Sequence, residues 1–352
     1  MDKKSRMSSD LFLGEPLSEY ELCPEQFLEE QEAAFARDIA RIHARSSEFV
    51  ATPCPACEST SADSIFSKYG FQFVRCEECG TIFMSPRPSE AVMADYYANS
   101  ENYAYWAKFI FPASEAVRRE KIHKPWLERI VGICNQHSAD RIGRLIEVGP
   151  GFGTFASLAA QSAVFDEVVA VEPTPELAAA CRERGVSVVE KRIEEVDDEV
   201  APADALVAFE VIEHLFRPRD FIRQARRLIR PDGLLILTCP NGAGFDIAEL
   251  GAGSQAVDAE HVNLFNPISL SRLVSNLGFE VLEVSTPGRL DAEIVRDEIL
   301  AGRHPMPASA FLRQVLIEKW DTLGWPFQQF LASNGLSSHM WLVARRKEVR
   351  ND

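Results

Sequence analysis

The feature that most constrains the fold is a glycine-rich turn that joins an apolar run to a helix-forming segment. Residues 145–153 read Leu-Ile-Glu-Val-Gly-Pro-Gly-Phe-Gly. The apolar run at 144–148 predicts a buried strand, and residues 154–163 predict the helix that follows the turn. Glycines at 149, 151 and 153 allow a sharp turn and let a ligand lie where a Cβ would collide. This order of strand, turn and helix predicts an α/β fold with a parallel sheet.

An acidic residue ends the next predicted strand. Residues 167–171 form that apolar run, and Glu172 follows it, nineteen residues after Gly153. A carboxylate there can accept hydrogen bonds from both hydroxyls of a ribose, which predicts a nucleoside pocket at the carboxyl ends of the strands. The spacing Gly-x-Gly-x-Gly differs from the dinucleotide fingerprint Gly-x-Gly-x-x-Gly. For the glycines alone, a tight structural turn without a ligand is the alternative.

The rest of the half-sheet follows in regular order. A strand at 204–209 leads into Glu-Val-Ile-Glu-His-Leu at 210–215, and a helix is predicted at 219–229. A Pro-Asp-Gly turn at 231–233 then precedes a strand at 234–239, which ends in Pro-Asn, and a glycine-rich loop is predicted after Asn241. Strands that alternate with helices in this way favour a doubly wound sheet.

This succession resembles the class I S-adenosylmethionine-dependent methyltransferases, in particular ubiquinone-biosynthesis O-methyltransferases and bacterial enzymes that tailor glycans and sugars. The resemblance covers about residues 125–285 and resumes near 337. It implies a Rossmann-like sheet, mostly parallel, with an antiparallel last strand. The matching pieces are Glu-Val-Gly-Pro-Gly-Phe-Gly at 147–153, Val-Glu-Pro at 171–173, Phe-Glu-Val-Ile-Glu-His-Leu at 209–215, Arg-Pro-Asp-Gly-Leu-Leu-Ile-Leu-Thr at 230–238 and Glu-His-Val-Asn-Leu-Phe-Asn-Pro at 260–267.

The resemblance also implies which residues bind S-adenosyl-L-methionine. The glycines would face the methionine part, Glu172 would hold the ribose, and Arg192 or Ile193 would border the adenine. Phe209 and Glu210 would lie near the sulfonium. The implied cofactor residues are Glu147, Gly149, Gly151, Gly153, Glu172, Pro173, Ile193, Phe209 and Glu210.

The candidate catalytic residues are His261, Glu213 and His214. A hydroxyl acceptor must lose its proton to a general base or at a metal ion. Glu210, Glu213 and His214 span one turn, so we expect their side chains to converge if that turn is helical. This Glu-x-x-Glu-His cluster with a later histidine resembles the divalent-metal site of some ubiquinone-biosynthesis and small-RNA 2′-O-methyltransferases. The alternative is a structural motif beside the cofactor, with no catalytic metal.

Four of the eight cysteines predict a zinc site. Two Cys-x-x-Cys pairs, Cys54 with Cys57 and Cys76 with Cys79, are separated by 18 residues. Each pair can offer two thiolates from one tight knuckle, and two knuckles complete a tetrahedron around a structural zinc ion. Disulfides or a redox pair are the alternatives. A reducing compartment disfavours the first, and the absence of a thioredoxin-like βαβ context disfavours the second.

The composition narrows the class of protein and of partner. The 352 residues, 46% hydrophobic and 26% charged, are enough for one large globular domain plus a smaller module. The formal net charge of −16 argues against a nucleic-acid partner, because phosphates would be repelled. The first residues lead into no apolar core, and no apolar run approaches about 18 residues, so we expect neither a secretory leader nor a membrane span. The sequence thus predicts a soluble, cytoplasmic protein with a small-molecule substrate.

We expect five segments along the chain. An insertion of about fifty residues interrupts the last hairpin of the sheet and carries predicted helices at 291–301 and 308–323. An insertion of that length at the open end of the sheet favours a lid or a homodimer contact. The segments are an N-terminal helical arm at 1–49 with a helix near 24–44, a zinc ribbon at 50–88, an aromatic-rich helical cap at 89–140, a methyltransferase domain at 141–285 and 337–348, and the insertion at 286–336.

The leading functional prediction is methyl transfer to a small polar acceptor, at a hydroxyl of a sugar or nucleotide-sugar, as in polysaccharide biosynthesis. The acceptor class rests on the resemblance alone, and a sugar C-methyltransferase is the first alternative. A nicotinamide-dependent sugar dehydrogenase or epimerase is another, but it predicts Gly-x-Gly-x-x-Gly and a Tyr-x-x-x-Lys pair, and the sequence has neither. A non-catalytic interaction protein that docks through its zinc ribbon is the third.

Overall fold

A seven-stranded sheet forms the centre of the protein, whose computed structural model describes residues 17–137 and 143–348. The strand order is β10-β11-β8-β7-β4-β5-β6. The five strands from β8 to β6 run parallel, whereas β11 is antiparallel to both β8 and β10. The prediction of a mostly parallel sheet with an antiparallel last strand is therefore confirmed. The strands are β4 (Arg144–Val148), β5 (Glu167–Val171), β6 (Ser187–Val189), β7 (Ala203–Phe209), β8 (Ile229–Pro240), β10 (Phe279–Ser285) and β11 (His339–Arg346).

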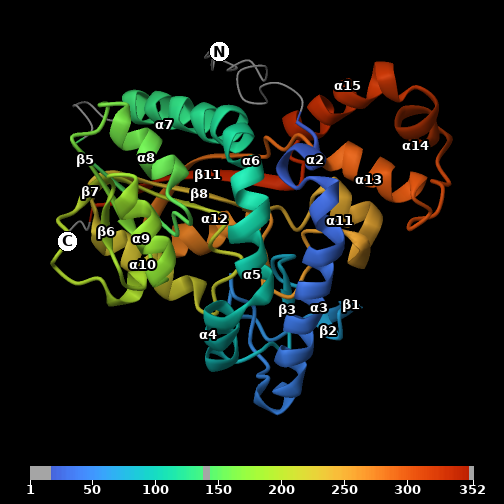
Figure 1. Ribbon diagram of the computed structural model, residues 1–352, viewed down its shortest axis with the longest axis horizontal. Coiled ribbons are helices and arrows are strands. Elements are labelled where there is room, and N and C mark those ends of the chain that lie inside the picture. The colour runs from blue at the N-terminus through green and yellow to red at the C-terminus, as the bar shows by residue number, and fades with distance from the viewer. Residues whose placement is uncertain (1–16, 138–142, 349–352) are drawn as a thin grey trace.

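Helices cover both faces of this sheet, because neighbouring strand residues point to opposite sides. In β4, Leu145 packs with helices α7 (Lys124–His137) and α8 (Thr154–Gln161). The next residue, Ile146, packs with α10 (Pro218–Leu228) and α12 (Pro267–Asn276) on the other face. Figure 1 shows the sheet between these two helical layers. The remaining crossover helix, α9, spans Pro175–Glu183, and a short 3₁₀ turn, η5, spans Ile193–Glu195.

A second sheet of four strands contains the predicted zinc ribbon. Its strands are β1 (Ala62–Lys68), β2 (Phe71–Cys76), β3 (Ile82–Met84) and β9 (Asn263–Leu264). The fourth strand was not predicted, and it comes from the far end of the methyltransferase segment. β9 pairs antiparallel with β3, placing Ile82 opposite Leu264. The ribbon therefore shares its sheet with the main body of the protein.

The ribbon also shares hydrophobic cores with the body. Phe83 and the side chains of the four ribbon cysteines belong to the apolar cluster of α10 and α12. Phe71 and Phe73 pack on the other side, with α3 (Leu28–Ala44) and α4 (Glu90–Asn99). The predicted helix near 24–44 is the 3₁₀ turn η1 (Glu25–Phe27) followed by α3.

The aromatic-rich segment forms a row of helices that leads to the main sheet. These helices are α4, α5 (Glu101–Tyr105), the π-helical turn η3 (Trp106–Ile110), α6 (Phe111–Arg118) and the π-helical turn η4 (Arg119–His123). At the start of the described chain lie the short helix α2 (Glu19–Leu22) and, after α3, the 3₁₀ turn η2 (Ser46–Glu48). None of the helices in the described ranges is long and apolar enough to cross a membrane.

The insertion forms a small helical lobe (Figure 1), and its hydrophobic core also includes Leu250 from outside the insertion. Its helices are α13 (Asp291–Leu300), α14 (Ala310–Arg313), the π-helical turn η7 (Gln314–Glu318) and α15 (Trp320–Ser333). The helical stretch predicted at 308–323 begins at Ala310 and is interrupted at one residue. The chain leaves helical geometry at Lys319, with φ −129°, and this break lets Leu316 before it and Leu331 after it enter the same core.

Two further local predictions need correction. The segment after β8, expected to be a glycine-rich loop, contains helix α11 (Phe245–Leu250) and the 3₁₀ turn η6 (Gly251–Gly253). α11 forms because Leu250 packs into the core of the insertion lobe. The expected Pro-Asp-Gly turn lies inside β8 as an irregularity in the pairing with β7, and Asp232 has a positive φ of 61° there. Contacts with other parts of the protein, and not the local sequence alone, thus determine the conformation of both segments.

Candidate active site

The carboxyl ends of β4, β5 and β7 open into a cleft of about 2350 Å³. Parallel strands bring their ends to one sheet edge, which is why residues far apart in the sequence meet there. Of the predicted site residues, Gly153 and Glu213 do not line the cleft. Those that do are Glu147, Gly149, Gly151, Glu172, Pro173, Ile193, Phe209, Glu210, His214 and His261.

The three glycines of the turn serve two different purposes. All have positive φ, at 68°, 54° and 75° for Gly149, Gly151 and Gly153. A Cβ on Gly149 would lie 2.7 Å from Val211 Cγ2, and one on Gly153 would lie 2.8 Å from Cys181 Sγ. A Cβ on Gly151 would meet no atom within 4 Å. Packing therefore requires the outer two glycines, whereas Gly151 forms an open floor on which a ligand can lie.

Two buried acids stand beside this floor. Glu172 is 4% exposed, and its Oε1 accepts a hydrogen bond of 2.9 Å from the Thr174 N–H. Burial raises the pKa of Glu172, although hydrogen bonds from Thr174 and Gly151 oppose the rise. Glu147 is 3% exposed, and its Oε2 has no hydrogen-bond partner among the described residues. Burial raises the pKa of Glu147 to about 8, with a smaller contribution from nearby Glu172.

Aromatic rings and an aliphatic side chain form further walls of the cleft. Phe209, at the end of β7, has ring centroids 4.7 Å from Trp126 and 4.8 Å from Phe155. Ile193 lies in η5 and is 4% exposed. Arg192, the other residue predicted beside the adenine, pairs with Glu195 in the same turn.

Glu213, His214 and His261 come together as a potential metal site. Each offers one ligand atom, and these atoms lie within 4.8 Å of one another. Glu213 is fully buried, and neither carboxylate oxygen has a hydrogen-bond partner in the described part of the chain. The rings of His214 and His261 have centroids 4.8 Å apart. Burial and nearby Glu210 raise the pKa of Glu213 well above its usual value.

The pKa values of the two histidines are shifted in opposite directions. Burial, with a smaller effect of His261, lowers the pKa of His214 well below its usual value. Burial also disfavours charge on His261, but Asp258, the Ala256 carbonyl and Glu260 outweigh it and raise the pKa of His261. His261 Nδ1 lies 2.9 Å from the Ala256 carbonyl oxygen. Because that oxygen can only accept, Nδ1 carries the proton and Nε2 is the ring atom that can accept one.

Glu210 does not join this group, so the convergence of Glu210 with Glu213 and His214, expected for a helical turn, does not occur. Its backbone has a positive φ of 52°, unusual for a residue with a side chain. Its Oε1 accepts a hydrogen bond of 2.6 Å from Thr238 Oγ1 and lies 3.4 Å from His339 Nδ1. The turn at 211–215 is not an α-helix, and the helical one-turn spacing therefore does not apply.

Sequence reasoning missed two groups that face the cleft. His339 begins β11, and because β11 is antiparallel its first residue lies at the carboxyl edge of the parallel strands. Glu260 accepts hydrogen bonds from the hydroxyls of Tyr96 and Tyr103. Burial raises the pKa of Glu260 to about 7. The Tyr97 hydroxyl lies 3.5 Å from His214 Nδ1. The aromatic-rich sequence of the helical cap could have indicated the tyrosines. No pattern in the sequence indicated His339.

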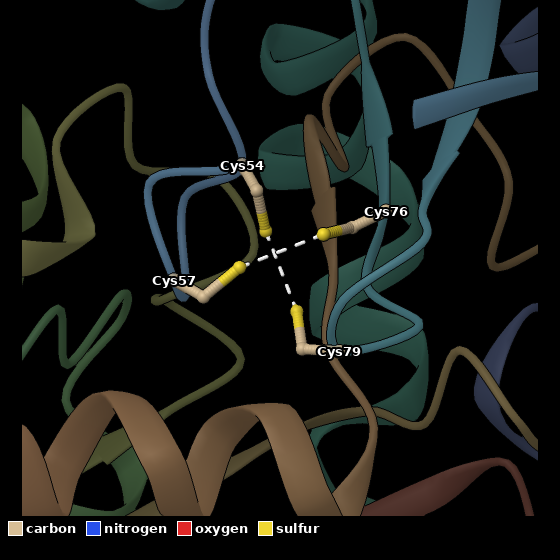
Figure 2. A group of neighbouring side chains, drawn as sticks. All are labelled: Cys54, Cys57, Cys76 and Cys79. Atoms are coloured by element: carbon tan, nitrogen blue, oxygen red, sulfur yellow. Dashed lines mark hydrogen bonds between the residues drawn. The ribbon is translucent and has the colours of Figure 1, made fainter. Parts of the chain in front are cut away.

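The four ribbon cysteines converge on one point, as Figure 2 shows. All are unpaired, and the Sγ atoms of Cys54 and Cys79, and of Cys57 and Cys76, are 3.5 Å apart. A disulfide would require about 2.05 Å. Four sulfurs at about 2.3 Å from a zinc ion would be about 3.8 Å apart in a tetrahedron. The donor set and spacing therefore fit zinc, and four protein ligands leave no open position for catalysis.

Comparison with known proteins identifies the central part of the chain. Residues 114–284 match the family model of the methyltransferase domain. This segment contains the glycine turn, Glu172 and the Glu213–His214–His261 cluster, and it ends within β10. Residues 114–284 thus form a methyltransferase domain similar to those of S-adenosylmethionine-dependent methyltransferases, in agreement with the sequence resemblance.

The relatives share this domain rather than the whole chain. The "Probable S-adenosylmethionine-dependent methyltransferase" of Mycobacterium tuberculosis (strain ATCC 25618 / H37Rv) is 30% identical over 155 residues, which cover 44% of this chain and 54% of that protein. The ubiquinone biosynthesis O-methyltransferase of Xanthomonas axonopodis pv. citri (strain 306) is 31% identical over 157 residues, 40% of this chain and 64% of that protein. The chain spans about half the length of the first of these relatives.

Among solved structures, the plantazolicin methyltransferase BpumL in complex with SAH is 10% identical. The match covers 72% of this chain and 93% of that one, with a TM-score of 0.46.

Proposed function

We propose that the protein transfers the methyl group of S-adenosylmethionine to a hydroxyl of a small polar acceptor, a sugar or a nucleotide-linked sugar. The observation that carries this proposal is the position of two groups at one sheet edge. The open glycine floor with Glu172 suits the cofactor, and the Glu213–His214–His261 cluster suits the acceptor.

The chain's own residues would bind and align the two reactants. S-adenosylmethionine, when bound, supplies a methyl group activated by its positive sulfur. Gly151 leaves room for the methionine part, and Glu172 offers a buried carboxylate to the ribose hydroxyls. Phe209 and Trp126 give the cleft an apolar wall that excludes water near the reacting carbon. Alignment and exclusion of water are the main tasks of an enzyme in such a displacement.

His261 is the proposed general base. Its Nδ1–H is held by the Ala256 carbonyl, which orients Nε2 as the proton acceptor. Asp258 Oδ2, 3.8 Å from Nδ1, would stabilise the positive ring after it takes the acceptor proton. A base of this kind contributes about 10²–10⁴-fold to rate.

A divalent metal ion at the same cluster is the second form of this proposal. A fully buried carboxylate with no partner on either oxygen, next to two histidines, is a donor set that fits a cation. Glu213, His214 and His261 would hold the ion, which would act as a Lewis acid toward the acceptor hydroxyl. The alternative is that Glu213 stays protonated, in keeping with its raised pKa.

The lining of the cleft beside the cluster supports a sugar acceptor. Tyr97 and Tyr103 present aromatic faces, and Glu260 and His261 present hydrogen-bonding groups. A sugar ring offers both an apolar face and several hydroxyls, so it can use both kinds of contact. A sugar C-methyltransferase would use the same site with a carbon acid as acceptor. The burial of the ribbon in the body argues against a separate docking module.

Two measurements test the proposal. Calorimetry should show binding of S-adenosylhomocysteine and no comparable binding of NAD. The protein should then transfer radiolabelled methyl from S-adenosylmethionine to members of a panel of sugars and nucleotide-sugars, with simple catechols as the comparison. Tight binding of NAD alone would refute the cofactor assignment. Methylation of catechols with none of the sugars would refute the acceptor class. Treatment with a chelator, followed by magnesium or manganese, separates the two forms of the mechanism.

The zinc ribbon and the cellular setting belong to the same proposal. Cys54, Cys57, Cys76 and Cys79 would hold one structural zinc ion, which suits a ribbon too small to fold on its own core. A cytoplasmic location, a homodimer and the lid role of the insertion remain predictions of the sequence. In support of the lid, residues 287–291 line the cleft.

A further inference from the structure

We infer that Asn263 and Arg87 are positioning residues that tie the zinc ribbon to the Glu213–His214–His261 cluster, so that the ribbon is part of the acceptor site. This inference rests on the proposed place of the acceptor at that cluster. It gives the ribbon a role beyond stabilising its own fold. The evidence is a set of hydrogen bonds that joins the cysteine knuckle and β3 to the two segments that carry the histidines.

Asn263 makes the central contacts. It is fully buried in β9, two residues after His261. Its side-chain Nδ2 donates to the Leu215 carbonyl at 2.7 Å and lies 3.3 and 3.4 Å from those of Ile212 and Glu213. Its backbone N–H donates to the Glu213 carbonyl at 3.0 Å. One asparagine therefore fixes the turn that carries Glu213 and His214 against the strand that carries His261.

Arg87 holds the other side of Asn263. Its Nη1 donates to Asn263 Oδ1 at 2.9 Å. The side chain is 3% exposed, and its guanidinium lies 4.7 Å from the ring centre of Phe216. Its backbone forms an isolated bridge with Val50, just ahead of the first knuckle. Burial lowers the pKa of Arg87 to about 10, so it keeps its charge at neutral pH. A buried arginine so placed leaves Asn263 little freedom to turn.

The cysteine knuckle joins the same set of bonds. The Asn266 Nδ2 donates to the Cys79 carbonyl at 2.9 Å. The Met84 N–H donates to the Val262 carbonyl at 3.0 Å, next to His261. The second knuckle, β3, β9 and the turn at 211–215 thus form one hydrogen-bonded unit. Because the ordering of the knuckle depends on zinc in the proposed ribbon, the geometry of the acceptor cluster depends on it too. The cofactor floor lies on β4 and β5, outside this unit.

The test compares two buried asparagines. Asn263→Ala removes the side chain that joins β9 to the turn at 211–215. Asn241→Ala is the matched control, because Asn241 is also fully buried but its side chain donates to the backbone carbonyls of Ser337 and Gly335 instead of those in the turn at 211–215. Ring signals of His214 and His261 are followed by NMR in histidine-labelled protein and assigned with His214→Gln and His261→Gln. Calorimetry with S-adenosylhomocysteine reports the cofactor floor.

We expect Asn263→Ala to shift or broaden both ring signals while the Kd for S-adenosylhomocysteine stays within about twofold, and methyl transfer to fall at least about tenfold. Asn241→Ala should leave both ring signals in place. Unchanged signals in a folded Asn263→Ala protein, or equal changes in both variants, would overturn the inference. If Asn263→Ala does not fold, Arg87→Lys provides the same readout with the buried charge kept. The NMR result needs no acceptor, so it decides the inference even if the proposed acceptor is wrong.

Discussion

Replacing Glu147 by glutamine should make the protein more stable, and increasingly so as the pH rises. Glu147 is 3% exposed at the end of β4, and one of its oxygens has no partner in the described chain. Burial raises its pKa from 4.5 to about 8, with Glu172 adding to the rise and a hydrogen bond from Ala156 opposing it. Glutamine has nearly the same shape but no charge to bury.

The direction of the pH effect on stability follows from whether the folded or the unfolded state binds the proton. Below pH 4.5 the carboxyl of Glu147 is protonated in both states, so it contributes no pH dependence. Between pH 4.5 and about 8 the unfolded chain is ionised while the folded protein keeps the proton. The folded state then binds more protons, and the free energy of unfolding falls by up to about 1.4 kcal/mol per pH unit. From 4.5 to 8 this amounts to about 5 kcal/mol as an upper limit.

Urea unfolding at pH 5, 6, 7 and 8, followed by circular dichroism, measures this directly. The gap in unfolding free energy between Glu147→Gln and the unchanged protein should widen steadily from pH 5 to pH 8. Glu167→Gln is the control, because Glu167 lies exposed at the other end of the neighbouring strand, paired with Arg144. The free energy of unfolding of Glu167→Gln, plotted against pH, should run parallel to that of the unchanged protein. A Glu147→Gln curve that also runs parallel would refute the assignment of a buried, protonated carboxyl.

Three further outcomes are expected. Glu172→Gln should weaken S-adenosylhomocysteine binding by about 1–3 kcal/mol in calorimetry, whereas Glu167→Gln should not; equal affinities would remove Glu172 from the ribose site. Metal analysis should find close to one zinc ion per chain, and Cys57→Ser should lower both zinc content and thermal stability; a folded, zinc-free protein would contradict this. His261→Ala should reduce turnover about a hundredfold with cofactor affinity unchanged; full activity would place the base elsewhere.

The central sheet was predictable because local pattern and tertiary role agree there. Each buried strand is an apolar run bounded by a turn or a helix start, and the bounds of β4 and β5 match the spans predicted at 144–148 and 167–171. The position of the proposed cofactor residues at one sheet edge was predictable for the same reason. Gly149 and Glu172 directly follow β4 and β5, so spacing along the chain translates into spacing at the sheet edge.

The acceptor end was less predictable, because long-range contacts build it. β9 has only two residues, Asn263 and Leu264, and its partner β3 lies near the other end of the chain. No short-range pattern marks so brief a strand. His339 reaches the cleft only because β11 runs antiparallel to β8. The insertion lobe depends on a hydrophobic core shared with α11, so its helix ends follow packing rather than local propensity.

Glu210 lies apart from the expected cluster, so the two acids of the Glu-x-x-Glu-His motif have different surroundings. Glu213 and His214 face His261, whereas Glu210 is turned toward Thr238 and His339 by its positive φ. A residue held in this sparsely populated conformation must be stabilised by its surroundings, and the hydrogen bond from Thr238 is one such contact. Glu210 therefore lies between the carboxyl end of β7 and the first residue of β11, and it lines the cleft. Glu213, in contrast, is fully buried next to His214 and His261. Of the two acids in the Glu-x-x-Glu-His motif, Glu210 thus lines the cleft, whereas Glu213 is buried behind its surface.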